Sequence, residues 1–204
     1  HRAPERTSLR ADSLDNDGRE MLGPSPQVSL DLKKIHSEIL AAHQAGGRGL
    51  WRFTPIEVDG LKLALQNPGE QHLAIMVVAH SSHSERELEA TLQSLMAAKL
   101  STEDLVWLLN AVRRHIIQGR FKEGERLTHE FLEALKALLH HPDGQVVEWA
   151  LRTVEECGAQ GIVFRPELAK IKPSLWFLWR AQSRTILELV TYLERRWSVR
   201  EKSV

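Results

Sequence analysis

The sequence is poor in cysteine and has no excess of charge of either sign. Cys157 is the one cysteine among 204 residues, which excludes internal disulfides and favours a reducing, cytoplasmic compartment. Lysine and arginine number 27, as do aspartate and glutamate, so the formal net charge is +0. We therefore do not expect a strong overall attraction to nucleic acid or to an anionic membrane.

Long apolar runs are missing as well. No stretch approaches the roughly 20 apolar residues that span a bilayer, so no membrane contact is expected. Residues 1–27 are polar and rich in Ser, Asp, Arg and Pro. They carry too little apolar surface to offset the entropy of ordering the chain. We predict a disordered tail or linker over residues 1–27 and a single helical-repeat domain over residues 28–204.

Apolar residues recur at helical spacing in the rest of the chain. The 42% hydrophobic content is enough for a buried core. Apolar side chains three and four residues apart predict amphipathic helices, and no segment alternates long enough to be a strand. The expected fold is all-α and built from antiparallel helix pairs. Its predicted helix caps are Ser29, Thr54, Ser84, Ser101 and Asp143.

The clearest pair spans Leu127 to Gly158. Two amphipathic halves are separated by the polar turn at 141–144, which is short enough to fold the helices back on each other. Asp143 is placed to cap the second helix, and Gly158 stands where a left-handed residue is needed after it.

This unit resembles a HEAT repeat in three features. Its first helix is rich in leucine, its turn contains Pro142-Asp143, and its second helix reads Val146-x-x-x-Ala150-Leu151 before a closing glycine. The resemblance implies stacked helix pairs with a binding or scaffolding role, without enzymatic chemistry or a cofactor.

A second unit is indicated further toward the N-terminus. Segment 61–68 matches 135–142 with the prolines in register, about seventy-four residues apart, which is twice a helical-repeat period of roughly 37 to 40. A middle unit with helices at 84–99 and 102–118 fits between them.

Candidate partner-binding residues come from charge and aromatic content. The densest basic cluster is predicted to span a helix end, a turn containing Gly119 and the next helix start. The last helix, expected to begin at Pro173 and to close the stack, carries three tryptophans of the kind that interface hot spots use, with core packing as their alternative. Trp107 and Trp149 are predicted to lie in the core. The candidate binding residues are Arg113, Arg114, Arg120, Lys122, Arg126, Trp176, Trp179 and Trp197.

These features predict a protein–protein interaction or scaffolding module whose partner is another protein. The alternative is a nucleic-acid-binding repeat module that uses the basic cluster on phosphates, although interleaved glutamates weaken its field. A third hypothesis is a metal enzyme with His80, His83 and a carboxylate. These histidines straddle a helix end and a loop with no second ligand motif, so we predict no enzyme, metal or cofactor.

Overall fold

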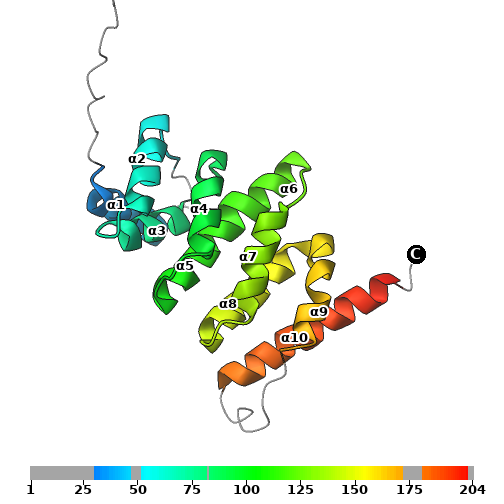
Figure 1. Ribbon diagram of the computed structural model, residues 1–204. Coiled ribbons are helices and arrows are strands. Elements are labelled where there is room, and N and C mark those ends of the chain that lie inside the picture. Colours follow the sequence, from blue (N-terminus) through cyan, green and yellow to red (C-terminus); the bar gives the residue numbers. More distant parts are fainter. Residues whose placement is uncertain (1–29, 47–51, 82, 172–180, 202–204) are drawn as a thin grey trace, which may run out of the picture.

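The computed structural model describes residues 30–46, 52–81, 83–171 and 181–201 (Figure 1). These residues form helices and loops with no strand, which confirms the predicted all-α fold. Residues 1–27 and the predicted helix start at Pro173 lie outside the described residues. The elements, in chain order, are α1 (Leu32–Gln44), α2 (Pro55–Gln66), α3 (Gln71–His80), the 3-10 helix η1 (Arg86–Leu88), α4 (Glu89–Met96), α5 (Thr102–Val112), the π-helical η2 (Arg113–Gln118), α6 (Gly119–Glu123), α7 (His129–Leu139), α8 (Gly144–Glu156), the 3-10 helix η3 (Gly158–Phe164), α9 (Arg165–Leu168) and α10 (Ala181–Glu201).

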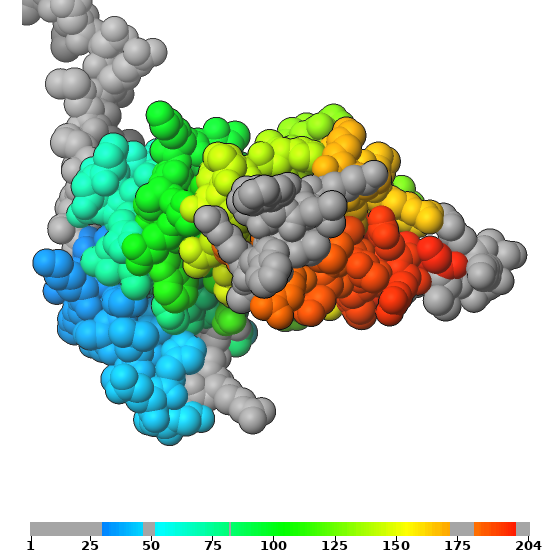
Figure 2. Space-filling view, turned by 90° about the horizontal axis from the view of Figure 1, so that it is seen from below, coloured from blue at the N-terminus to red at the C-terminus, as the bar shows by residue number. Residues whose placement is uncertain are grey.

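The helices form stacked pairs in two rows. The pairs are α2 with α3, α4 with α5, and α7 with α8. Helices α1, α3, α5, α8 and α10 pack in that order and form what we call the long row, while α2, α4, α7 and α9 form a second row. Figures 1 and 2 show that sequence order is kept along the stack, from α1 (blue) to α10 (red). In this order α5, α8 and α10 are consecutive helices of the long row, although they are far apart in the sequence.

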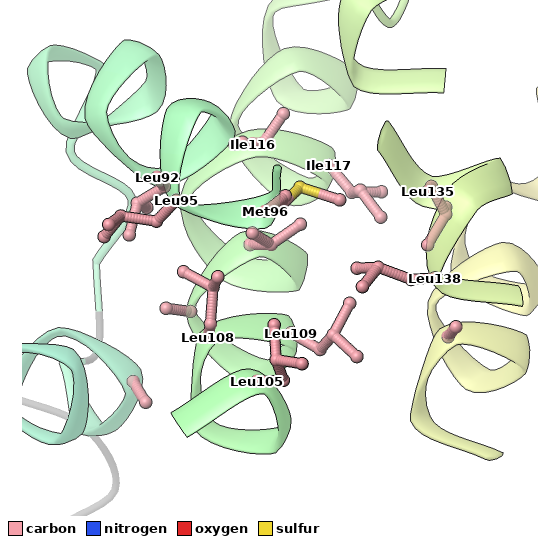
Figure 3. Packing of buried hydrophobic residues seen from close by; sticks show 14 of the residues in the cluster. Leu92, Leu95, Met96, Leu105, Leu108, Leu109, Ile116, Ile117, Leu135 and Leu138 are labelled. Carbon is pink, nitrogen blue, oxygen red and sulfur yellow. The ribbon is translucent and has the colours of Figure 1, made fainter. Parts of the chain in front are cut away.

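The core lies between the two rows. Figure 3 shows its central part, where leucines of α4, α5 and α7 meet the two isoleucines of η2. Because these residues recur at three- and four-residue spacings, each helix turns one apolar stripe inward. The labelled residues are all buried: Leu92, Leu95, Met96, Leu105, Leu108, Leu109, Ile116, Ile117, Leu135 and Leu138.

Three predicted helix starts are confirmed, and in each the capping side chain bonds to the first turn of its own helix. Thr54 makes the predicted capping box with Glu57, and the side chains of Ser101 and Asp143 accept from the amides of Asp104 and Gln145.

Two predicted starts are not where the sequence placed them. Ser84 caps no helix, because η1 begins after Glu85 and has no side-chain cap. Ser29 lies outside the described residues, and Asp31 caps α1 through the amide of Lys34.

The turn after the basic cluster also differs from the prediction. Helix α5 runs through η2 into α6 as one rod, and Gly119 is helical with a φ of −61°. The chain turns at Gly124 instead, whose φ of +74° suits glycine. Gly158 has the predicted left-handed conformation, with a φ of +58°.

Candidate functional site

The predicted basic cluster is dispersed around the rod formed by α5, η2 and α6. Arg113 forms an ion pair with Glu156 of α8. Arg114 donates to the backbone carbonyl of Ser81 at the end of α3. Successive helical residues point in different directions, so neighbours in sequence reach different elements. These arginines therefore do not form one cationic surface.

Arg120 and its neighbours form a second polar network. Arg120 donates from Nε to Glu89 at 2.6 Å and forms a 3.2 Å ion pair with Glu125, and its side chain is 17% exposed. Arg86 completes this network through Glu123 and Glu125. Lys122 and Arg126 are exposed, and their side chains have no partner within the described residues. Two of the five predicted cations thus remain unpaired there.

Of the three tryptophans predicted to bind a partner, Trp197 is the one that the structure describes. Trp176 and Trp179 lie outside the described residues. Trp197 is 1% exposed, and a β-carbon added at Gly161 of η3 would stand 3.3 Å from its Cζ2. Trp197 is therefore a core residue that holds α10 to η3. It is too deeply buried to be the partner-binding anchor that was predicted.

Trp149 and Trp107 are only partly buried, although the sequence pattern placed both in the core. The guanidinium carbons of Arg113 and Arg152 lie 5.8 and 5.7 Å from the centre of a Trp149 ring. Cation–π attraction at these distances holds the two arginines against the indole. Arg152 is further fixed by Glu148, one turn earlier on α8, at 2.8 Å.

A surface hollow of about 430 Å³ opens beside this group, and we call it the Trp149 hollow. Arg113 at the end of α5 forms one side, α8 contributes most of the wall, and Arg196 comes from α10. Its volume is within the range of ligand sites, roughly 300–1,000 Å³. The lining residues are Arg113, Trp149, Arg152, Glu155, Glu156, Gly158 and Arg196.

A separate chain of ring contacts runs from α5 toward α1. Trp107, two turns before Arg113 on the same rod, lies 4.9 Å from the ring of His80 on α3, measured between ring centroids. His80 in turn contacts the rings of His36 and His43 on α1, at 5.6 and 6.1 Å. The long row therefore carries histidine, tryptophan and arginine side chains on four successive helices.

One histidine of this chain of contacts, His36, has a lowered pKa, and two others donate to backbone carbonyls. Burial, followed by the nearby His80, lowers the pKa of His36. The Nδ1 atoms of His43 and His80 lie 2.9 and 2.8 Å from the carbonyls of Ile39 and Met76, so each Nδ1 carries the proton and donates. No group of three His, Cys, Asp or Glu in the described part of the chain is arranged to hold a metal ion.

A buried Ser81–His115 contact joins α3 to η2. The Nδ1 of His115 accepts from the amide of Glu85 at 2.8 Å, so Nε2 carries the proton and donates to the carbonyl of Val78 at 3.0 Å. Ser81 Oγ lies 2.8 Å from Nε2. Because Nε2 has no lone pair to offer, this histidine is not oriented to accept the serine proton. Burial lowers the pKa of His115 to about 4, which suits a structural role.

Only part of the Trp149 hollow could be predicted from the sequence. Glu148, Trp149, Arg152, Glu155 and Glu156 recur at helical spacing on one side of α8, which marks a polar face with one aromatic residue. The partners from α5 and α10 are about 40 residues away on either side, and periodicity does not reveal such distant contacts.

Within the residues described, no helix combines the length and the apolar character needed to cross a bilayer. Searches with protein-family models, curated proteins and solved structures gave no match to this chain.

Proposed function

We propose that this chain is a protein-binding scaffold built on HEAT-like stacked helix pairs, with the Trp149 hollow as its contact surface. The observation that carries the proposal is a partly exposed tryptophan flanked by two arginines in a hollow formed by three helices. Trp and Arg are the residue types that dominate the binding energy of protein interfaces. The single cysteine, Cys157, is unpaired, which supports a reducing, cytoplasmic location for this role.

The paired state of the arginines favours a protein partner over nucleic acid. A protein that binds a phosphate backbone needs several cations free to displace counterions. Here Arg113, Arg114 and Arg120 bond to groups of the chain itself. Held in this way, a guanidinium group still offers its flat face and remaining N–H groups to a partner.

Site-specific crosslinking tests the proposal in the full chain. A photoreactive phenylalanine derivative would replace Glu155, which lines the hollow, and in a separate control Glu133, which is exposed on α7 of the second row. After irradiation in a lysate of the source cells, we expect a nuclease-resistant protein adduct at position 155. The same adduct should be absent at position 133.

A second variant ties that adduct to the hollow. Trp149→Ala should abolish it, while circular dichroism and the urea midpoint report that the chain still folds. Equal adducts at positions 155 and 133, or an adduct indifferent to Trp149→Ala, would refute this surface. An adduct that consists of nucleic acid would favour the alternative function.

A further inference from the structure

We infer that the Trp149 hollow takes a short acidic segment of the partner protein, with one Asp or Glu carboxylate held by Arg152 and Arg196. The inference rests on the proposed function and adds the chemistry of the bound segment. It is carried by the hydrogen-bond donors that the arginines of the hollow leave unused.

The three arginines that line the hollow differ in how many of their N–H groups already donate hydrogen bonds. Arg113 uses Nη2 on Glu156 and Nη1 on the side-chain oxygen of Asn110. Arg152 directs Nε and Nη2 to a single oxygen of Glu148, which leaves its Nη1 unbonded within the described structure. Arg196 is partly buried and has no side-chain partner among the described residues. The Nε of Arg113 also has no partner, but it is buried. Within the described residues, the unbonded donors that are not buried are therefore those of Arg152 and Arg196.

A carboxylate is the acceptor that matches these donors. Guanidinium groups bind carboxylates through short charge-assisted hydrogen bonds, about twice as strong as neutral ones. Arg152 on α8 and Arg196 on α10 line the same hollow, and α8 packs directly on α10. Arg152 is already oriented by Glu148 and Trp149, so it loses little side-chain entropy when it binds.

The charge balance of the hollow sets how acidic the segment should be. Three arginines and two glutamates line it, which leaves one positive charge in excess. Glu155 and Glu156 lie on the same wall and would repel the closely spaced phosphates of a nucleic acid. Next to a single carboxylate, the same glutamates accept hydrogen bonds from peptide N–H groups, and Trp149 offers a flat surface to a neighbouring side chain.

Peptide selection on the full chain tests this inference. A random heptapeptide library displayed on phage would be selected against wild type and against the double variant Arg152→Gln/Arg196→Gln. We expect wild type to enrich peptides that contain Asp or Glu, and the double variant to lose that enrichment. A synthetic copy of the most enriched peptide, labelled with fluorescein, then gives dissociation constants by anisotropy.

A matched control comes from the same helix. Arg195 neighbours Arg196 on α10, is exposed and does not line the hollow. Arg195→Gln removes the same charge, so its dissociation constant should stay within about twofold of wild type, whereas Arg196→Gln should raise it about tenfold or more. Circular dichroism and urea midpoints check that each variant folds.

Several results would overturn the inference. These are enrichment of basic or neutral peptides, an absence of enrichment, equal losses for Arg195→Gln and Arg196→Gln, or tighter Arg196-dependent binding of a thymidine oligonucleotide. The crosslinked adduct separates this failure from failure of the proposed function. An adduct that needs Trp149 but survives excess acidic peptide overturns the acidic segment and leaves the protein-binding surface standing.

Discussion

Replacement of Trp197 by alanine gives the sharpest test of how α10 closes the stack. Trp197 is among the largest fully buried side chains, at 1% exposure. A buried tryptophan removes about 150–250 Å² from water, worth about 4–6 kcal/mol at roughly 25 cal/mol per Å². Measured Trp→Ala substitutions in cores cost about 3–5 kcal/mol, because the site relaxes only in part. We therefore expect Trp197→Ala to lower the free energy of unfolding by about 3–5 kcal/mol.

Urea unfolding followed by circular dichroism measures this loss. A domain has only about 5–15 kcal/mol of stability, so the variant should unfold at a much lower urea concentration. Tyr192→Ala is the control, because Tyr192 lies on the same helix and is 47% exposed. It should change stability by no more than about 0.5 kcal/mol. A loss below about 1 kcal/mol for Trp197→Ala would refute the core assignment and return Trp197 to the candidate surface anchors.

Three further predictions concern other buried groups of the stack. Gly161→Ala should cost about 1–3 kcal/mol in urea unfolding, since a β-carbon there would stand 2.9 Å from the backbone oxygen of Val154; a neutral result would contradict the close approach. His115 should titrate near pH 4 by NMR. Its folded pKa lies below the unfolded value of about 6.5, so its contribution to stability is present above that value. About 3 kcal/mol should be lost as the pH falls from about 7 to 4, and a His115 resonance that titrates near 6.5 would refute this. Burial raises the pKa of the Cys157 thiol to about 12, so Ellman's reagent at about pH 8 should label it only after unfolding; rapid labelling of the folded chain would show an accessible thiol.

Local interactions made much of the fold predictable from the sequence. Thr54, Ser101 and Asp143 cap helices by bonding to amides two or three residues away, and such bonds depend on short segments alone. Ser84 fails as a cap because a distant residue intervenes. The amide of Glu85 donates to His115, which belongs to another helix, and η1 begins after that contact.

The candidate site was less predictable because its geometry depends on contacts between helices. Arg113, Arg114 and Arg120 are close in sequence, but their partners Glu156, Ser81 and Glu89 lie 31–43 residues away. Periodicity gives the direction of a side chain around its own helix and says nothing about the neighbouring helix. Trp149 shows the same limit, since it lies at the edge of an apolar stripe and is left partly exposed where α8 meets its neighbours.

The helices that line the Trp149 hollow differ in how firmly they are packed, because they occupy different positions in the long row. Helix α5 packs between α3 and α8, whereas among the described residues α8 is the main long-row neighbour of α10. Opening free energies rise with the number of packed neighbours, so amide protons of α10 should exchange sooner than those of α8. Arg196 belongs to α10, the helix that is displaced more easily. Arg113 at the end of α5 and Trp149 on α8 belong to helices that are displaced less easily. The hollow can therefore widen through movement of a single helix while the tryptophan and its flanking arginines keep their arrangement.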